Sequence, residues 1–426
     1  LEMLSLKYIR ENTGYVQDSL TQKQSQVSIS DLLEFDIQRR NCLKEVEVLR
    51  AEKNQVSSSI AELKKGGGNA KADIAAMRIV SNRIKEVETE LRKIEESIAN
   101  DIYYVPNIVH SSVPLGKDET SNLVIKKWGE VPDFSFEPKD HLKLGEDLKL
   151  FDFKRSVKMA GAGFPLYTGL GAKLERALIN FMLDYHVTKH NYTELFPPFL
   201  AHAEAMQNTG QLPKFKDDMY EIPEDALYCI PTAEVPVTNL HQGEIIPEAE
   251  LPKKYAAYSA CFRREAGSYG KDTRGLIRVH QFNKVELVKF VHPDDSYKEL
   301  ETLLENAEAI LQALGLHYRV LELCSGDLSF SAAKCYDLEV WSPAENKYLE
   351  VSSCSNFENF QARRSNIRYR NNSTGKSELI HTLNGSGVAT PRLMVALLET
   401  YQQEDGTIKL PAALHPFMNM DIISIS

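Results

Sequence analysis

Apolar residues recur at heptad spacing between residues 32 and 98. The first series contains Leu32, Phe35, Cys42, Val46, Leu49, Val56, Ile60 and Leu63, with interruptions at Arg39 and Lys53. The second series contains Met77, Val80, Ile84, Val87, Leu91, Ile94 and Ile98. Between them lies Lys64–Asn69, whose glycines cannot continue a helix without cost. The spacing predicts two helices folded back as an antiparallel coiled coil, the first about 32 residues and about 48 Å long.

This hairpin alone is compatible with two roles. A structural or dimerising coiled coil is the commoner role for a heptad pattern. The alternative is an arm that grips an extended partner. Lys64, Lys65 and Lys71 at the tip suit a phosphate backbone, but they equally suit a solvated turn. The heptad pattern therefore leaves both roles open.

The helical pattern stops around Ile102–Trp128, where prolines and polar stretches appear. We place a domain boundary here, with an N-terminal domain over residues 1–105 and a second domain over residues 106–426. In the second domain, amphipathic stretches alternate with short β-rich runs, which predicts both helices and strands. One helix begins near Leu170, and Tyr192–Phe196 then forms a predicted strand that ends at two prolines.

Composition narrows the class of protein. The 426 residues are 42% hydrophobic and 26% charged, and no apolar run approaches the roughly 20 residues that a bilayer span needs. A net charge of -10 argues against a protein that coats nucleic acid indiscriminately. The six cysteines form no Cys-x-x-Cys pair, so we expect neither a disulfide framework nor zinc. We expect Leu1-Glu2 to be a cloning remnant before a start at Met3, and a cytoplasmic protein without an export signal.

Two strings carry candidate chemistry. Tyr258–Ser268 followed by Thr273–Phe282 predicts a strand, a glycine-rich loop and a returning strand, with Arg263 and Glu265 at the loop. Arginine suits a site for two anions because it stays ionised and offers a planar fork. The second string, Asn384–Glu399, predicts a glycine-bearing turn that leads into an apolar helix, with Arg392 in its first turns.

Together these strings resemble the three motifs of class II aminoacyl-tRNA synthetases, in the form typical of bacterial seryl-tRNA synthetases. Motif 1 would span about residues 170–200, with Pro197 as its proline, motif 2 about 258–288 and motif 3 about 384–400. The resemblance covers nearly the whole chain. It implies an α+β fold, with an antiparallel β-sheet flanked by helices in the catalytic domain, and a tRNA-binding N-terminal domain whose arm spans about residues 32–98.

The resemblance also implies roles for individual residues. Arg263 would hold the ATP α-phosphate and the serine carboxylate, Glu265 the adenine amino group and Arg392 the γ-phosphate, while Phe282 would stack on adenine. Further ATP-binding positions would be Arg264, Val279, Glu350, Val351, Ser352 and Ser353. Glu350 and Ser353 would hold Mg2+ between phosphates, and oxygen ligands suit this hard cation.

Serine recognition is implied by residues outside the general motifs. Thr232, Ala233 and Glu234 would receive the amino group, Glu286 would bind the hydroxyl, and Ser386 would complete the pocket. A buried acceptor for the hydroxyl makes a site selective, because an analogue without the hydroxyl leaves that acceptor unpaired.

The implied protein is a homodimeric ligase that uses ATP and Mg2+ to activate L-serine and transfers it to tRNA(Ser), and also to tRNA(Sec), with no zinc and no membrane partner. Three alternatives stand beside it: a catalytically silent synthetase-like binding or assembly protein, a ligase that loads a carrier protein, and a purely structural coiled coil. Gly161–Phe164 departs from many relatives, which carry an arginine just before the phenylalanine.

Overall fold

A computed structural model of the chain describes residues 5–266 and 274–424. It forms two compact units, Leu1–Pro106 and Asn107–Ser426. Among the described residues, no helix is both long and apolar enough to cross a membrane. Part of the predicted glycine-rich loop, residues 267–273, lies outside the described residues.

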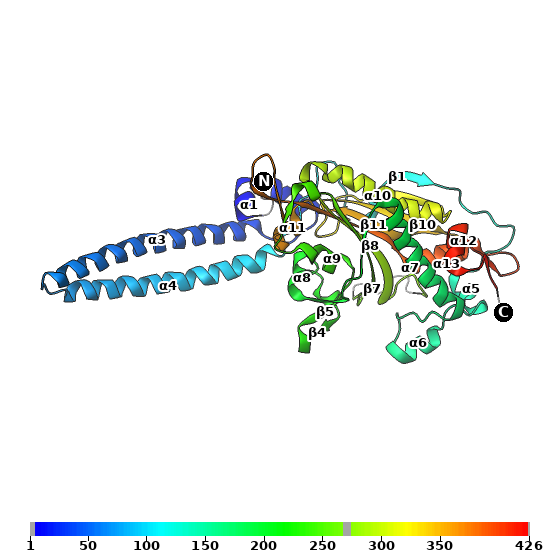
Figure 1. The fold of residues 1–426 in the computed structure, drawn as a ribbon, viewed down its shortest axis with the longest axis horizontal. Helices are drawn as coiled ribbons and strands as arrows, with labels where there is room; N and C mark the ends of the chain where they lie inside the picture. Colours follow the sequence, from blue (N-terminus) through cyan, green and yellow to red (C-terminus); the bar gives the residue numbers. More distant parts are fainter. Residues whose placement is uncertain (1–4, 267–273, 425–426) are drawn as a thin grey trace. The chain divides into compact units, whose positions relative to one another are not determined.

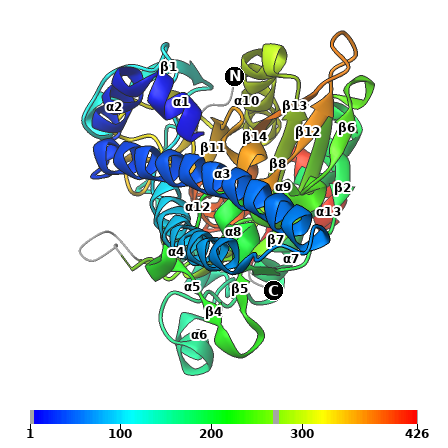
Figure 2. The ribbon, with the colours of Figure 1, turned by 90° about the vertical axis from the view of Figure 1, so that its left-hand side faces the viewer.

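The first unit is helical. Its helices are α1 (Leu6–Glu11), α2 (Thr13–Gln22), α3 (Ile29–Lys65) and α4 (Lys71–Ile102). Helices α3 and α4 lie side by side as an antiparallel hairpin in both views (Figures 1 and 2), which confirms the predicted arm. Helix α3 has 37 residues, so it is about 55 Å long and begins before the first predicted heptad residue. Ser28 explains this start, because its hydroxyl accepts a hydrogen bond from the Asp31 N–H at 3.4 Å.

Packing along the hairpin follows the heptad series in its basal part. Val46, Val87 and Ile98 are buried between α3 and α4, whereas Leu63 near the tip is 41% exposed. The interruption at Arg39 has a structural reason. Asp36 on the same helix is 1% exposed and forms ion pairs with Arg10 of α1, Arg39 and Arg40 at 2.5, 3.4 and 3.5 Å.

The second unit is built on an eight-stranded sheet in the order β1-β9-β10-β11-β14-β8-β7-β2, antiparallel except for the parallel pair β2 and β7. Its strands are β1 (Leu123–Trp128), β2 (Thr193–Leu195), β7 (Lys253–Phe262), β8 (Gln281–Val291), β9 (Tyr318–Glu322), β10 (Lys334–Ser342), β11 (Lys347–Asn356) and β14 (His381–Ala389). Smaller sheets contain β3 (Leu200–His202), β4 (Glu221–Ile222), β5 (Leu227–Cys229), β6 (Ile245–Pro247), β12 (Arg368–Arg370), β13 (Ser377–Leu379), β15 (Ile408–Lys409) and β16 (Ile422–Ile423).

Helices complete the second unit and confirm the α+β prediction. They are α5 (His141–Asp147), α6 (Phe153–Ala160), α7 (Gly169–His190), α8 (Ala203–Asn208), α9 (Glu234–Thr238), α10 (Ser296–Ala313), α11 (Phe360–Ser365), α12 (Thr390–Tyr401) and α13 (His415–Met418). Short 3-10 helices lie at Glu119–Ser121, Lys216–Asp218, Pro223–Asp225, Asn239–His241, Glu248–Glu250, Pro293–Asp295 and Ala412–Leu414. Apolar side chains of α7, α10 and α12 pack with those of the central strands in one large core cluster.

Two predicted junctions had different outcomes. The helix followed by a strand near residue 170 is confirmed as α7 and β2. The glycine-bearing turn at Asn384–Ala389 is wrong, because these residues belong to strand β14. Gly385 and Gly387 serve packing across the sheet instead of a turn. An added Cβ would lie 2.8 Å from Cys354 Sγ at Gly385 and 2.7 Å from His186 Nε2 at Gly387.

Candidate active site

A cavity of about 610 Å³ opens over the central strands of the second unit. Most of the predicted site residues line it: Thr232, Glu234, Arg263, Glu265, Val279, Phe282, Glu286, Glu350, Val351, Ser352, Ser353, Ser386 and Arg392. Two predicted residues do not line it. Ala233 is fully buried beside α9, and the Arg264 guanidinium lies 5.9 Å from the Tyr220 ring centre.

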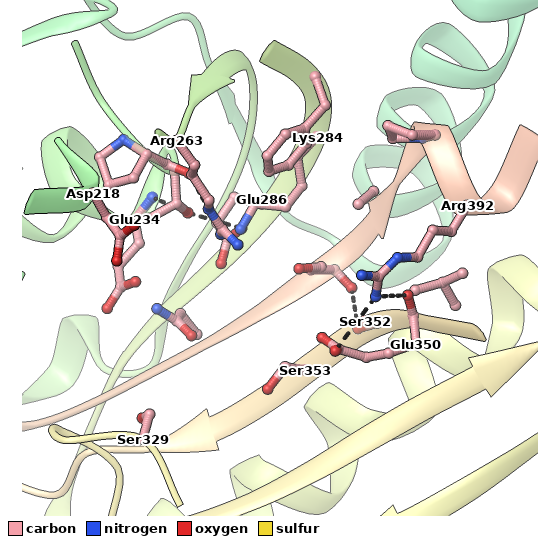
Figure 3. A pocket seen from close by; sticks show the side chains of 18 of the residues that line it. Asp218, Glu234, Arg263, Lys284, Glu286, Ser329, Glu350, Ser352, Ser353 and Arg392 are labelled. Atoms are coloured by element: carbon pink, nitrogen blue, oxygen red, sulfur yellow. Dashed lines mark hydrogen bonds and ion pairs between the residues drawn. The ribbon is translucent and has the colours of Figure 1, made fainter. Parts of the chain in front are cut away.

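The register between strands β8 and β14 places residues at one end of the cavity next to each other. Glu286 of β8 lies directly opposite Ser386 of β14, so these two predicted serine-binding residues are neighbours in the sheet. Lys284 precedes Glu286 by two positions, and alternation along a strand puts both side chains on the same face. Figure 3 shows Lys284 and Glu286 along one strand, with Glu234 and Arg263 nearby.

The polar groups at this end form a connected network. Glu286 Oε2 accepts a hydrogen bond from Thr232 Oγ1 at 3.2 Å and forms a close ion pair with Lys284 Nζ. Thr232 Oγ1 in turn accepts from the Glu234 N–H at 3.2 Å, which ties the first residue of α9 to β8. The side chains of Lys284 and Glu286 are only 8% and 2% exposed. Their pairing therefore takes place away from bulk water.

Glu234 is the second buried carboxylate of this network. Gln361 Nε2 donates to its Oε1 at 2.6 Å, and Gln361 is itself oriented by Thr382, whose hydroxyl donates to Gln361 Oε1 at 2.8 Å. Burial, followed by the negative charge of Glu286, raises the pKa of Glu234 from 4.5 to about 7. A bound ammonium group would offset both effects.

Arg263 stands where the predicted loop leaves β7. Its Nε donates to the Pro231 carbonyl at 3.3 Å, and its guanidinium lies 5.1 Å from the Phe282 ring centre. Its backbone exchanges two hydrogen bonds with His280: the Arg263 N–H donates to the His280 carbonyl at 2.8 Å, and His280 Nδ1–H donates to the Arg263 carbonyl at 2.9 Å. The loop is thus closed at its base by backbone and imidazole together.

Glu265 lies on the same loop in the left-handed backbone region, at φ 52°. Its carboxylate forms a close ion pair with Arg278, so the residue expected to meet the adenine amino group already has a cationic partner. The following residue is held by Asp218, whose Oδ1 accepts the Ala266 N–H at 2.8 Å. These contacts hold Glu265 and Ala266 in place at the start of the loop.

Arg392 forms the opposite end of the cavity. It is the third residue of α12, directly after Pro391, and its Nε donates to the Ile277 carbonyl at 3.0 Å. Its Nη1 donates to the Glu350 carbonyl at 2.9 Å and lies 3.5 Å from Glu350 Oε2 (Figure 3). Arg392 and Arg263 therefore supply positive charge at separate ends of one cavity.

Side-chain oxygen atoms lie beside Arg392. Glu350 has a half-exposed carboxylate, and the Ser353 hydroxyl lies 3.0 Å from Cys335 Sγ. Asp337 pairs with Ser353 across β10 and β11. Burial, followed by the charge of Glu350, raises the pKa of Asp337 well above its usual range. The Glu350 carboxylate and the Ser353 hydroxyl are oxygen ligands of the kind that suits a hard divalent cation.

The Gly161–Phe164 segment packs under the same loop. Gly163 has φ +82°, and a Cβ there would lie 2.2 Å from His280 Cδ2. The His280 N–H also donates to the Gly163 carbonyl at 2.7 Å. In this chain a glycine at position 163 therefore lets the segment approach the histidine that closes the loop.

Sequence reasoning missed several residues that line or support the cavity: Gln211, Asp218, Arg278, Lys284, Ser329, Ser331, Gln361 and Asn384. Lys284 carried a usable signal, because it stands two positions from Glu286 on a predicted strand and therefore shares its face. Gln361 carried none, since its contact with Glu234 joins residues 127 positions apart.

Comparisons with known proteins show the family to which the chain belongs. Residues 3–109 match the family model of the seryl-tRNA synthetase N-terminal domain, and residues 215–401 match that of the tRNA synthetase class II core domain (G, H, P, S and T). The chain is 54% identical to a serine–tRNA ligase of Chloroherpeton thalassium, with 99% of this chain and 100% of the relative covered. It is also 54% identical to a serine–tRNA ligase of Geobacter sulfurreducens, over 98% of each chain.

Solved structures show the same likeness. The seryl-tRNA synthetase of Pyrococcus horikoshii, crystallised with ATP, superimposes with a TM-score of 0.92 at 36% identity over the full length of both chains. The two family models together match the arm and residues 215–401 of the cavity-bearing unit. The chain belongs to the serine–tRNA ligase family of class II aminoacyl-tRNA synthetases.

Proposed function

We infer that this protein is a serine–tRNA ligase, which activates L-serine with ATP to form seryl-adenylate and transfers the seryl group to tRNA(Ser). One observation carries the inference: a single cavity combines arginines for phosphate and carboxylate groups with buried acceptors for an ammonium and a hydroxyl group. That combination matches the functional groups of ATP and serine.

In the first step, the serine carboxylate attacks the α-phosphorus of ATP in line, a C–O–P bond forms, and diphosphate leaves with the electrons of the broken P–O bond. Two anions must approach each other while charge builds on the phosphoryl oxygens, so catalysis consists mainly of positioning and charge neutralisation. Arg263 would neutralise the carboxylate and the α-phosphate, and Arg392 the γ-phosphate. Phe282 would stack on the adenine ring, within reach of Arg263.

Serine would bind at the Glu286 end of the cavity. Glu234 and Thr232 would receive the ammonium group, while Glu286 and Ser386 would hold the hydroxyl. The network among these residues pre-orients the acceptors before serine enters. In the second step, the terminal ribose hydroxyl of the tRNA attacks the carbonyl carbon of seryl-adenylate, and AMP leaves.

Glu350 and Ser353 would hold Mg2+, which supplies charge neutralisation between the phosphates when it is bound. We expect Glu350→Ala to raise the Mg2+ concentration for half-maximal exchange by at least about tenfold. Glu339→Ala is the matched control, because Glu339 pairs with Arg319 at 2.5 Å on the neighbouring strand and does not line the cavity. If the two variants depend equally on Mg2+, Glu350 is not a Mg2+ ligand.

Three further features are part of the proposal. A homodimer through motif 1 is supported by strand β2, which stands at one edge of the main sheet, and by the adjacent Phe196, which is 76% exposed. Charging of tRNA(Sec) is supported by the resemblance to bacterial relatives and is tested by charging of that tRNA. A cytoplasmic location follows from the tRNA substrate.

The first test is serine-dependent exchange of pyrophosphate into ATP by the full-length protein. Exchange is expected with serine as the amino acid. Folded protein that performs no exchange would instead support the catalytically silent alternative, although Arg263, Glu286 and Arg392 are all in place at the cavity.

The second test separates the arm from the chemistry. Removal of Leu32–Ile98, bridged by a short flexible linker, is expected to spare exchange because every cavity-lining residue lies in the second unit. The same deletion is expected to abolish tRNA charging. A variant that still charges tRNA would show that the arm has another role, such as the structural one that the heptad pattern left open.

A further inference from the structure

Lys284 is a buried cation in the serine-binding end of the cavity, and the family motifs leave it without a role. Its side chain is 8% exposed, lines the cavity and forms a close ion pair with Glu286. A lysine is almost never buried to this extent unless it is paired. We propose that Lys284 is a specificity-determining residue, which orients Glu286 so that one of its oxygens accepts the serine hydroxyl. This inference rests on the proposed function.

The orientation follows from which oxygen is occupied. Within the described chain, the hydrogen bond and the ion pair of Glu286 both use Oε2, which meets Thr232 Oγ1 and Lys284 Nζ. A carboxylate anchored through one oxygen cannot rotate freely, so Oε1 has a defined direction. Ser386 stands opposite Glu286 in the sheet, which puts the second hydroxyl-binding residue beside it.

Charge balance gives Lys284 a second effect. Glu234 and Glu286 are 7% and 2% exposed, and like charges in such surroundings favour uptake of a proton by one of them. The groups that act on Glu234 are Glu286, Lys284, Gln361 and Asn384, and Lys284 is the cation among them that lowers its pKa. Lys284 therefore helps to keep one carboxylate available for the hydroxyl and the other for the ammonium group.

Selectivity follows from the fixed direction of Glu286 Oε1. A buried carboxylate oxygen needs a hydrogen-bond donor, so alanine, which lacks the hydroxyl, leaves it unpaired and binds poorly. Without Lys284, the Thr232 hydroxyl is the remaining anchor of this carboxylate among the described residues, so Oε1 loses its fixed direction and the preference for serine falls. Loss of Lys284 should therefore weaken serine binding and discrimination together.

Strand β8 offers a matched control. Lys289, on the same strand, is 1% exposed and pairs at 2.8 Å with Glu299 of α10, whose side chain is 19% exposed. It stands an odd number of positions from Lys284 and faces away from the cavity, where it contacts Thr302 of α10. A change at Lys289 removes a buried ion pair without touching serine recognition.

The experiment compares Lys284→Met, Lys284→Arg and Lys289→Met with the full-length wild-type protein in pyrophosphate exchange. We expect Lys284→Met to raise the KM for serine by about 100-fold and to change the KM for ATP by less than about threefold. The ratio of kcat/KM for serine over alanine should fall at least about tenfold. Lys289→Met should leave both KM values and the ratio close to wild type.

A pH profile distinguishes this role from simple support of the fold. In the wild type, the KM for serine should rise as the pH falls below about 7, because protonated Glu234 no longer binds ammonium. In Lys284→Met that rise should begin at higher pH, since the cation that favours ionised Glu234 is gone. Lys284→Arg keeps the charge but changes its reach, so it should raise the KM for serine while its pH profile stays at the wild-type position.

The outcomes separate the two proposals. Wild-type protein without exchange would refute the proposed function. Active wild type, with Lys284→Met indistinguishable from Lys289→Met in serine KM and pH profile, would overturn the role of Lys284 alone. If Lys284→Met does not fold, Lys284→Arg decides, and an unchanged KM for serine in that variant also overturns the role.

Discussion

Replacement of Glu175 by glutamine should make the second unit more stable at alkaline pH. Glu175 lies on α7 and is 5% exposed. Its Oε1 accepts hydrogen bonds from Thr390 Oγ1 at 2.5 Å and Asn283 Nδ2 at 2.7 Å, which joins α7 to the start of α12 and to β8. Its Oε2 is buried and has no hydrogen-bond partner among the described residues. Glutamine keeps the accepting oxygen and removes the charge.

The magnitude follows from the pKa. Burial raises the pKa of Glu175 from 4.5 to about 7. A carboxyl group whose pKa is higher in the folded state contributes its full stability below pH 4.5 and loses it as the pH rises toward 7. At about 1.4 kcal/mol per pH unit, the loss across that window is about 3 kcal/mol. Glu175→Gln should therefore gain up to about 3 kcal/mol over wild type at pH 8, and little at pH 5.

Urea unfolding followed by tryptophan fluorescence measures this effect in the relevant unit. The chain has two tryptophans, Trp128 and Trp341, and both lie in the second unit. Glu399→Gln is the control: Glu399 is fully buried, but both its oxygens accept hydrogen bonds, including 2.5 Å from Ser342 Oγ. The Glu399→Gln variant should be less stable than wild type at pH 8. A Glu175→Gln effect that is equal at both pH values, or destabilising at pH 8, would refute the reasoning.

Three further changes have defined outcomes. Asp36→Ala should lower the free energy of unfolding of the first unit by about 3 kcal/mol, measured by circular dichroism, because it leaves Arg10 and Arg39 without a buried partner. Glu45→Ala removes an exposed ion pair, and an Asp36→Ala loss no larger than the Glu45→Ala loss would contradict this. Gly163→Ala should raise the KM for ATP about tenfold, because the added Cβ displaces His280. Gly161→Ala should not raise it, because Gly161 has a similar φ but an added Cβ there would have no atom within 4 Å. Gly387→Ala should raise the KM for serine, because its Cβ would meet His186 beside Ser386.

Regular spacing explains why the arm could be predicted from sequence. Heptad residues such as Val46 and Val87 need only their own two helices to bury them, so their pattern is local. The start of α3 was less predictable, because it depends on the Ser28 hydroxyl that caps the helix before the first heptad residue.

The error at Asn384–Ala389 has a different cause. Glycine is most often interpreted as a turn residue, because few other residues adopt its conformations. Here Gly385 and Gly387 are needed for their missing side chains, since Cys354 and His186 occupy the space that a Cβ would take. Both neighbours come from distant parts of the chain, so no local sequence pattern predicts these contacts.

The serine-binding end of the cavity depends both on local sequence patterns and on contacts between distant segments. The acidic residues could be chosen from their strings, but their chemistry depends on contacts that the strings do not contain. Thr232 and Glu286 are 54 positions apart, and Gln361 reaches Glu234 from a third segment. Lys284 is the exception, because its place two residues before Glu286 fixes a shared face once the strand is recognised. A charged residue at that spacing from a predicted ligand is therefore a candidate partner even before a structure is known.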